Sequence, residues 1–280
     1  MSQSNQPTKI LTIGGSDSGG AAGIQADLKT LTVLGVYGMS VITIVTAQNS
    51  LHVADVYQLP PEFVASQLDA VLSDYGAQGT KTGFIGQASL IKVIAEKINA
   101  YKLANVVIDP VLVNHRGEPM FPETVTQAYI DRLLPVADLI TPNLREAELL
   151  TGVKILNAAS MNDAANHLFS MGSGSVLITG RRVDVDVVDL LLDGKTMTEF
   201  RSPWIDSPNR HGSGDTLSAA ICAFLSLNFT VSEAVDKARE YTFEAIKRAR
   251  QWRLGAGHGP VSSWGNRQVL EQEPAGSKDT

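Results

Sequence analysis

One stretch of the sequence organises the rest of the chain: Asn209-Arg210-His211-Gly212-Ser213-Gly214-Asp215-Thr216-Leu217-Ser218-Ala219-Ala220. Its first half is a turn of small residues, and its second half begins an apolar helix that we expect to run to about Leu227. Two glycines flank Ser213, so the backbone can turn tightly and direct several N–H groups into one concave spot, where the helix adds the positive end of its dipole. Gly212, Ser213 and Gly214 are therefore predicted to bind an anion.

Asp215 follows directly, in the first turn of the predicted helix. A carboxylate beside an anion site is repelled by the anion, which suggests that it is there for chemistry. It could accept the proton of a substrate hydroxyl while the N–H groups hold the phosphoryl group being transferred. The alternative is that Asp215 caps the helix. This stretch alone leaves both interpretations open.

Composition limits the classes of protein to consider. The chain has 280 residues, of which 44% are hydrophobic and 19% charged, which predicts one large globular α/β domain. A net charge of −6 gives no basic surface on average, so no nucleic-acid partner is expected. The single cysteine, Cys222, excludes an internal disulfide and a cysteine zinc cluster. Residues 1–8 are polar and no apolar run approaches the roughly 18 residues that span a bilayer, so we expect a cytoplasmic protein without a membrane partner.

Predicted strands and helices alternate along the chain. Strands are expected at 9–14, 38–46, 79–84, 105–111, 139–141 and 175–180, and helices at 24–34, 60–75, 87–101, after 142, at 212–227 and at 231–252. Residues 183–192 and 196–201 are expected to form a hairpin that turns at Asp193-Gly194. This alternation predicts an α/β fold with a doubly wound, largely parallel central sheet flanked by helices.

Polar and glycine-rich segments follow the predicted strands. The first, at 14–23, is rich in glycine, but it carries neither the Gly-Lys-Ser/Thr of a Walker A loop nor the Gly-x-Gly-x-x-Gly of a dinucleotide fold. Asp27, one turn into the next helix, could face the crevice at this sheet edge, although an exposed helix acid is the simpler interpretation. Gln48 ends the second strand, where its amide could pair with a heteroaromatic ring or serve only in a turn.

Two further strand ends carry acids. Asp109-Pro110 ends a buried strand, and the Asp could orient water on a magnesium ion, although Asp-Pro also begins turns for local reasons. Pro142 and Asn143 mark the start of a helix in which Glu146 could face a phosphate crevice. A capping box between Glu146 and the helix start is the competing interpretation.

Several ordered motifs closely resemble the hydroxymethylpyrimidine/phosphomethylpyrimidine kinase family of the ribokinase-like superfamily. They cover the chain from about Ile10 to Gly265 and lie at 14–30, 37–43, 46–49, 109–111, 139–144 with Glu146, 211–214 and 216–220. The resemblance implies transfer of the γ-phosphoryl group of ATP to the hydroxymethyl group of a pyrimidine, and then to its monophosphate, in thiamine biosynthesis.

The resemblance also implies roles for individual positions. Those that match the pyrimidine pocket are Gly15, Asp27, Gln48 and Val111, with Phe84 at a pocket position usually held by methionine. Those that match the nucleotide and magnesium region are Asn143 and Glu146, with Asp109 as a second magnesium candidate and Thr179, Gly180 and Arg181 as nucleotide contacts. Gly212 to Gly214 match the anion hole. The resemblance to this kinase family implies ATP and Mg²⁺ as cofactors.

Besides Phe84, the chain departs from the family at two places. Asp215 stands where close relatives commonly carry cysteine, and residues 179–182 are Thr-Gly-Arg-Arg in place of Lys-Gly-Gly-His. The lysine that would neutralise phosphate is missing, and Arg181 or Lys81 could substitute for it. These departures bear most on the second phosphorylation, because a phosphorylated acceptor brings extra negative charge.

Three functions remain open: the pyrimidine kinase, a pyridoxal kinase of the same fold, and a ligand-binding relative without turnover. The expected organisation is a single ribokinase-like kinase domain at 9–266, between a disordered segment at 1–8 and a flexible tail at 267–280. The resemblance implies a homodimer, and the sequence leaves open whether a monovalent cation assists.

Overall fold

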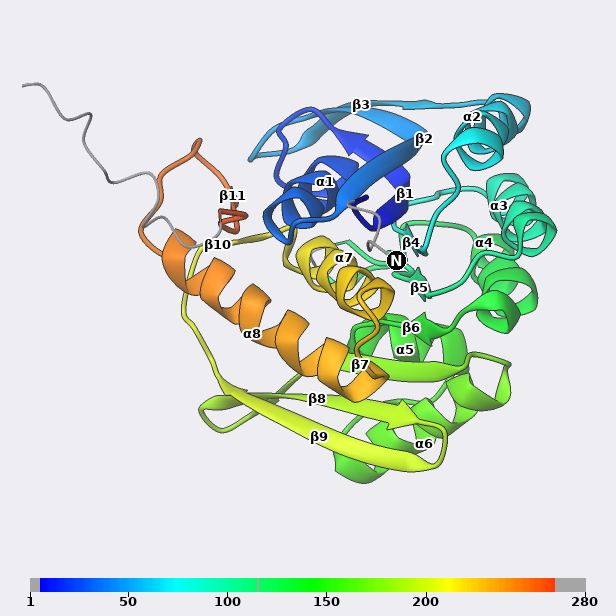
Figure 1. Ribbon diagram of the computed structural model, residues 1–280. Coiled ribbons are helices and arrows are strands. Elements are labelled where there is room, and N and C mark those ends of the chain that lie inside the picture. Colours follow the sequence, from blue (N-terminus) through cyan, green and yellow to red (C-terminus); the bar gives the residue numbers. More distant parts are fainter. Residues whose placement is uncertain (1–5, 115, 265–280) are drawn as a thin grey trace, which may run out of the picture.

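The computed structural model describes residues 6–114 and 116–264 (Figure 1). The predicted tail 267–280 and residues 1–5 of the predicted N-terminal segment lie outside the described residues. No helix in the described ranges is long and apolar enough to cross a membrane.

A sheet of nine strands forms the centre of the molecule, in the order β3-β2-β1-β4-β5-β6-β7-β8-β9. The strands are β1 Lys9–Asp17, β2 Tyr37–Gln48, β3 Val53–Gln58, β4 Gly79–Thr82, β5 Val106–Ile108, β6 Leu139–Ile140, β7 Ser175–Val183, β8 Asp186–Asp193 and β9 Thr196–Pro203. The six strands from β2 to β7 in this order run parallel, whereas β3, β8 and β9 are antiparallel additions at the two edges. The predicted largely parallel sheet is thus confirmed.

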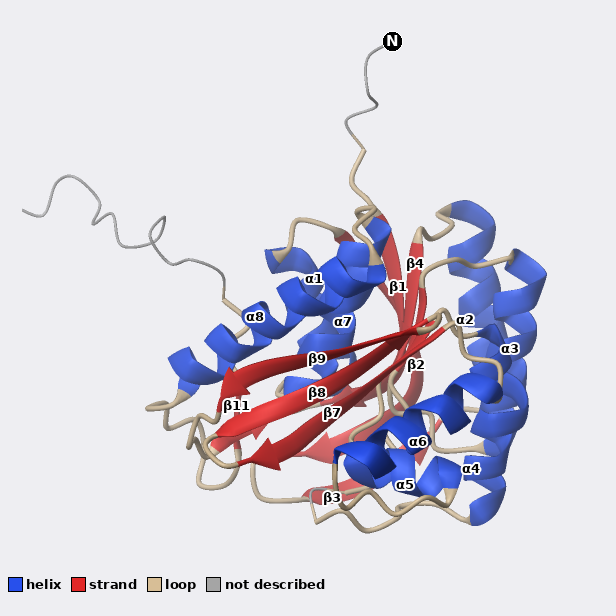
Figure 2. Cartoon of the chain, turned by 90° about the horizontal axis from the view of Figure 1, so that it is seen from below, coloured by secondary structure: helices blue, strands red, loops and turns tan. Residues whose placement is uncertain are grey.

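Helices cover both faces of the sheet (Figure 2). One face carries α1 Gly23–Val33, α7 Ser213–Ser226 and α8 Val231–Ala249, and the other carries α2 Pro61–Asp74, α3 Ala88–Tyr101, α4 Glu123–Ala128, α5 Leu144–Thr151 and α6 Ala158–Ser170. A π-helical turn, Tyr129–Leu133, and a 3₁₀ turn, Leu134–Val136, continue α4.

Two hydrophobic cores result, because successive side chains of a strand point to opposite faces. In β5, Val106 and Ile108 pack toward α2–α6, and Val107 packs toward α1, α7 and α8. All three are buried, which is why β5 is a short continuous apolar run instead of an alternating one.

The structure adds elements that the sequence pattern did not predict: β3, α4 with its two turns, α6, and a parallel pair of short strands, β10 Asn209–His211 and β11 Gly259–Pro260. The predicted hairpin turning at Asp193-Gly194 is confirmed as β8 and β9. The Gly-Lys-Thr at 194–196 lies in this turn and not between a strand and a helix, so it is no Walker A loop.

Candidate active site

The turn before α7 packs directly on the glycine-rich loop that follows β1. Gly212 is the N-cap of α7 and has a left-handed backbone with φ of 79°. A Cβ atom at this position would lie 1.9 Å from the carbonyl oxygen of Ala21. Only glycine permits both this backbone conformation and this approach. Because an N-cap glycine has no side chain, it leaves the first N–H groups of the helix to other partners.

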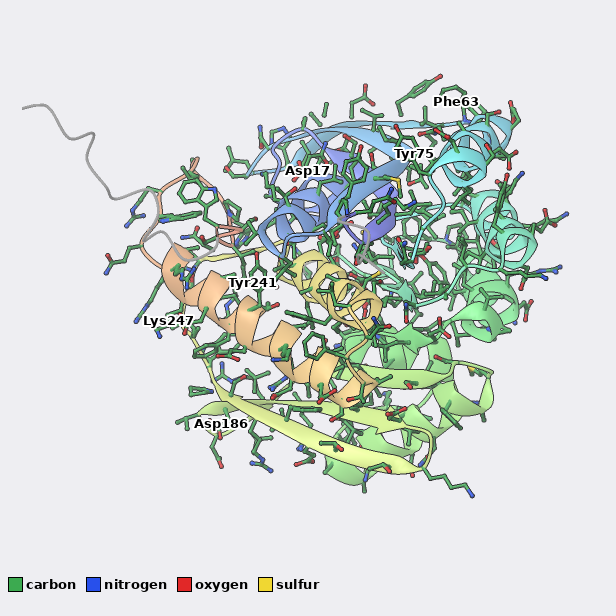
Figure 3. The ribbon with its side chains drawn as sticks, in the orientation of Figure 1. Asp17, Phe63, Tyr75, Asp186, Tyr241 and Lys247 are labelled. Carbon is green, nitrogen blue, oxygen red and sulfur yellow. The ribbon has the colours of Figure 1, made fainter. Side chains whose placement is uncertain are left out.

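Asp17 fixes the loop on which Gly212 rests. Its buried carboxylate accepts hydrogen bonds from the backbone N–H groups of Gly19, Ala21 and Ala22 at 2.8 to 2.9 Å. Figure 3 shows Asp17 beside α1 and β1, at the N-terminal half of the sheet. The segment that carries Ala21 is therefore held by one carboxylate and presented to the α7 turn.

Asp215 contacts a buried lysine. Its Oδ1 lies 3.1 Å from the Nζ of Lys81 in β4, and the same Nζ lies 2.8 and 3.0 Å from the two carboxylate oxygens of Asp27 in α1. Lys81 and Asp27 are each 1% exposed. The interpretation of Asp27 as an exposed helix acid is therefore wrong, because its carboxylate faces inward toward β4.

Burial and the neighbouring charges act in opposite directions on the pKa of Asp27, and they also do so on the pKa of Lys81. Burial raises the pKa of Asp27 to about 7, against the lowering effect of Lys81. For Lys81, burial acts to lower the pKa, but the carboxylates of Asp27, Asp215 and Asp109 outweigh it and raise the pKa of the ammonium group. Lys81 therefore keeps its positive charge at neutral pH.

Asp109 lies on the other side of the α7 turn. Its Oδ2 accepts a hydrogen bond from the Ser218 hydroxyl at 3.0 Å, and it is 3.8 Å from the point where a Cβ of Gly214 would be. Burial raises its pKa to about 7. A cation would offset the cost of ionising this buried carboxylate, so Asp109 fits a magnesium site.

Glu146 and Asn143 form a capping box at the start of α5. Asn143 accepts hydrogen bonds from the N–H groups of Arg145 and Glu146, and Glu146 accepts one from Asn143 and one from Leu112, each at 3.0 Å. The capping interpretation, which the sequence left open, is confirmed. Burial raises the pKa of Glu146. Its two oxygens already have backbone donors, so Glu146 fits magnesium best through water.

The described residues contain no group of three or more His, Cys, Asp or Glu side chains that could hold a metal. Mg²⁺ does not need such a group, because it is usually bound by one or two carboxylates together with substrate phosphates and water.

Four of the five residues assigned to the acceptor pocket lie at the carboxyl ends of β1, β2, β4 and β5, and the fifth, Asp27, lies in α1. A Cβ at Gly15, beside a bulge in β1, would be 3.2 Å from the Phe84 ring, which packs on Phe121 with 5.3 Å between ring centroids. Gln48 Nε2 lies 2.9 Å from His211 Nε2, which links the end of β2 to the α7 turn. Val111 has φ of 38°, a strained conformation for a β-branched residue and one that is often found at functional sites.

Residues 179–181 lie in β7, beside the start of α5. Thr179 N–H donates to the Pro142 carbonyl at 3.0 Å, and Gly180 N–H donates to Asp189 at 2.7 Å. Arg181 pairs with Glu199 of β9 at 3.2 Å. Because Lys81 directs its hydrogen bonds to Asp27 and Asp215, both cations considered as substitutes for the missing lysine already have carboxylate partners.

A different pair of cations lies near the α7 turn. The guanidinium groups of Arg182 and Arg210 stack on Trp204, at 4.0 and 3.5 Å from the ring centroid. Burial lowers the pKa of Arg210, and Arg182 lowers it further by repulsion between like charges. Sequence reasoning missed this stack, as it missed Asp17, Ser218 and the position of Lys81. A lysine in a strand of a predicted core was the one available signal, because lysine is rarely fully buried without a partner.

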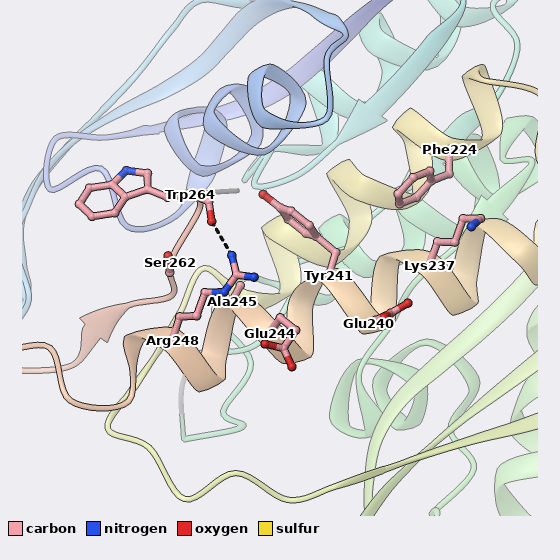
Figure 4. Close-up of a pocket in the computed structure, with 9 residues that line it drawn as sticks. All are labelled: Phe224, Lys237, Glu240, Tyr241, Glu244, Ala245, Arg248, Ser262 and Trp264. Carbon is pink, nitrogen blue, oxygen red and sulfur yellow. Dashed lines mark hydrogen bonds between the residues drawn. The ribbon is translucent and has the colours of Figure 1, made fainter. Parts of the chain in front are cut away.

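A cavity of about 330 Å³ lies away from these residues, between α7, α8 and residues 262–264 (Figure 4). Tyr241, Arg248 and Trp264 are among the residues that line it, and Arg248 donates a hydrogen bond to the Trp264 carbonyl. None of the predicted site residues lines this cavity.

The chain is similar to proteins of one family over most of its length. The phosphomethylpyrimidine kinase family model matches residues 17–262. A hydroxymethylpyrimidine/phosphomethylpyrimidine kinase of Mycobacterium bovis is 39% identical over 259 residues, which cover 91% of this chain and 94% of the relative. The thiamine biosynthesis bifunctional protein of Geobacter sulfurreducens is 45% identical over 90% of this chain, but the chain spans only 51% of that relative.

The comparison with solved structures agrees with this family match. A phosphomethylpyrimidine kinase of Clostridium difficile superposes with a TM-score of 0.77 and 36% identity, covering 85% of this chain and 99% of that one. The pyridoxal kinase of Bacillus subtilis, in a complex with ADP, superposes with a TM-score of 0.86 and 36% identity, covering 95% of this chain and all of that one. The fold is thus ribokinase-like, and the protein is a kinase that belongs to the phosphomethylpyrimidine kinase family.

Proposed function

We propose that the protein transfers the γ-phosphoryl group of ATP to the hydroxymethyl group of 4-amino-5-hydroxymethyl-2-methylpyrimidine, and then to its monophosphate. The observation that carries this proposal is the placement of Asp215 in the first turn of α7, with one oxygen held by Lys81 and with the glycine turn beside it. A carboxylate in that position can take the proton of an acceptor hydroxyl. The N–H groups of Gly212 to Gly214 can stabilise the charge on the phosphoryl group.

The acceptor is proposed to lie against Gly15, Phe84, Val111, Gln48 and Asp27. The flat ring of a pyrimidine can stack on Phe84, whose ring packs so closely on Gly15 that an added Cβ would lie 3.2 Å from it. The Gln48 amide offers both a donor and an acceptor to ring nitrogens and the amino group.

The nucleotide is proposed to lie between the α7 turn and the segment 179–182, with Asn143 and Glu146 on its other side. The pyridoxal kinase of Staphylococcus aureus, whose chain is 35% identical, has been solved in complex with AMP-PCP. Arg182 and Arg210 supply positive charge close to the turn, which a triphosphate needs. Asp109 and Glu146 would hold Mg²⁺ through its water molecules, and the ion would neutralise charge on the phosphates.

We test the function with Asp215→Asn, which keeps the shape of the side chain and removes the base. ADP release is measured with hydroxymethylpyrimidine, its monophosphate and pyridoxal, and binding of each acceptor is measured by calorimetry. We expect the variant to lose about 10²- to 10⁴-fold in turnover while acceptor binding changes little. Turnover like that of the wild type would remove Asp215 from the base role. Replacing K⁺ by tetramethylammonium in the same assay tests the need for a monovalent cation.

Pyridoxal is the second candidate acceptor, because the solved structures with TM-scores of 0.86 are pyridoxal kinases. Turnover of pyridoxal without turnover of either pyrimidine would make this the function. Loss of the second pyrimidine phosphorylation alone would point to the altered segment 179–182.

We further propose a cytoplasmic homodimer with no nucleic-acid or membrane partner. The edge strand β3 supports the dimer, because all six of its residues are exposed and Val53, Val56 and Tyr57 are apolar or aromatic. Such an edge is a ready partner for a second copy of the strand. Analytical ultracentrifugation at micromolar concentration distinguishes a dimer from a monomer.

A further inference from the structure

Lys81 is an unusual residue for its position in the fold. It lies in β4, between β1 and β5 in the middle of the sheet, and it is 1% exposed. Burying a charged ammonium group is costly unless it is paired and hydrogen-bonded. A hydrophobic residue would stabilise a purely structural strand better, so the presence of a lysine here requires an explanation.

The hydrogen bonds of Lys81 give that explanation. An ammonium group has three N–H donors, and the three carboxylate oxygens within reach are both oxygens of Asp27 and Oδ1 of Asp215, at 2.8, 3.0 and 3.1 Å. Thr12 also donates to Asp27, at 2.5 Å, which fixes the Asp27 end of the cluster in the core. Lys81 is thus anchored on one side and presents its remaining donor to Asp215.

The surroundings of Asp215 differ from those of Asp27. Asp215 is 16% exposed, whereas the other two members of the cluster are buried. At Gly83, a Cβ would lie 3.0 Å from Lys81 Nζ and 3.7 Å from Asp215 Oδ1. Gly83 therefore lies beside the Lys81–Asp215 pair and adds no side chain there. With Oδ1 held by Lys81, the other oxygen of Asp215 is left to meet a ligand.

We propose that Lys81 is a positioning residue that orients Asp215 toward the acceptor hydroxyl and ties it to Asp27 in the acceptor pocket. This inference rests on the proposed function. In the transfer step, the hydroxyl oxygen forms a bond to the γ-phosphorus, and the bond from that phosphorus to the β,γ-bridging oxygen breaks. ADP leaves with the electron pair, and the hydroxyl proton passes to Asp215. Lys81 keeps its proton throughout.

A purely structural ion pair would behave differently, and paired variants separate the two roles. Lys81→Met alone would leave Asp27 buried without a cation and could prevent folding. The informative comparison is therefore between Asp27→Asn and the double variant Asp27→Asn/Lys81→Met. Both have a neutral residue at position 27, and they differ only in the lysine that contacts Asp215.

For these variants we measure kcat, the KM for the acceptor and the melting temperature. Asp27→Asn should raise the acceptor KM, because Asp27 belongs to the proposed acceptor pocket. Its kcat is the reference for the double variant, because Lys81 still contacts Asp215 in the single variant. The double variant should lose a further 10²-fold or so in kcat, the size of effect that a misplaced catalytic group produces. Its melting temperature should stay within a few degrees of that of Asp27→Asn. Values of kcat within about threefold of each other in the two variants would overturn the proposal.

A second measurement does not depend on the acceptor being known. In a crystal structure of the double variant, we expect the Asp215 carboxylate to rotate away from its wild-type orientation. An unchanged orientation refutes the positioning role whichever acceptor the enzyme uses. If instead the wild-type enzyme turns over none of the three acceptors, the proposed function fails, and the crystal structure still decides the role of Lys81.

Discussion

Gly212→Ala adds one methyl group at a point where the structure predicts a large local effect on the candidate site. The added methyl group would lie 1.9 Å from the Ala21 carbonyl oxygen, whereas real Cβ atoms do not approach such an atom closer than 3.0 Å. The α7 turn and the loop of residues 20–22 must therefore separate by at least about 1 Å. Both segments are backbone, so no flexible side chain can absorb the movement.

The expected loss of stability and the expected loss of turnover have separate causes. A left-handed backbone costs a residue with a Cβ roughly 1–2 kcal/mol. The forced separation displaces the N–H groups of the anion site, and a misplacement of about 1 Å can lower turnover by about 10²-fold, or roughly 2.7 kcal/mol in the activation barrier. We therefore expect modest destabilisation and a large loss of turnover.

Gly35→Ala is the matched control. Gly35 has φ of 77°, nearly the same as Gly212, but a Cβ there would have nothing within 4 Å. Both variants carry the same cost of a left-handed backbone, and Gly212→Ala should lose further stability in denaturant unfolding because of the forced separation. Only Gly212→Ala should lose ATP turnover with the acceptor. If turnover of Gly212→Ala stayed within twofold of that of Gly35→Ala, the close contact would not shape the site and the reasoning would be wrong.

Two further predictions concern buried groups. Because burial raises the pKa of Asp109 to about 7 from 3.8, the folded protein binds an extra proton between these pH values, so its stability falls as pH rises from 4 to 7. Asp109→Asn should thus be more stable than the wild type at pH 8, by on the order of 4 kcal/mol for a rise of about three pKa units, and this gap should shrink toward pH 5. Urea unfolding of both proteins in metal-free buffer at pH 5 and pH 8 checks this prediction. A difference in unfolding free energy that does not change with pH would contradict it. Burial likewise raises the pKa of the Cys222 thiol to about 12. The folded protein should therefore not react with Ellman's reagent at pH 8, while the unfolded chain should release one equivalent of thionitrobenzoate from its single thiol. Rapid reaction of the folded protein would show that the thiol is accessible.

Much of the fold was predictable because its signals are local. The runs of strand-forming residues in β1, β2 and β5 and the glycine-rich or polar segments after them predict parallel strands with loops at one edge. The strand β3 was missed because all its residues are exposed, so it has no buried face to produce a pattern. The helix α6 was missed because its apolar residues are mostly alanines in a polar segment.

The candidate site was predictable in kind but not in its contacts. The Gly-Ser-Gly-Asp run indicated an anion site and a base from backbone chemistry alone. Lys81 lies 134 positions from Asp215 in the chain, so its pairing depends on sheet order, which no local pattern contains. The inward direction of Asp27 depends on the same lysine.

The contact between Gly212 and the loop at Ala21 also bears on how the protein matures in the cell. Ala21 lies near the start of the chain and Gly212 lies much later, so β1 can pair with β2 and β4 long before residue 212 has been synthesised. A nascent chain can thus form strand pairs in the N-terminal half of the sheet before the proposed phosphoryl site exists. A chain whose synthesis ends before α7 is therefore expected to fold only in part and to consume no ATP.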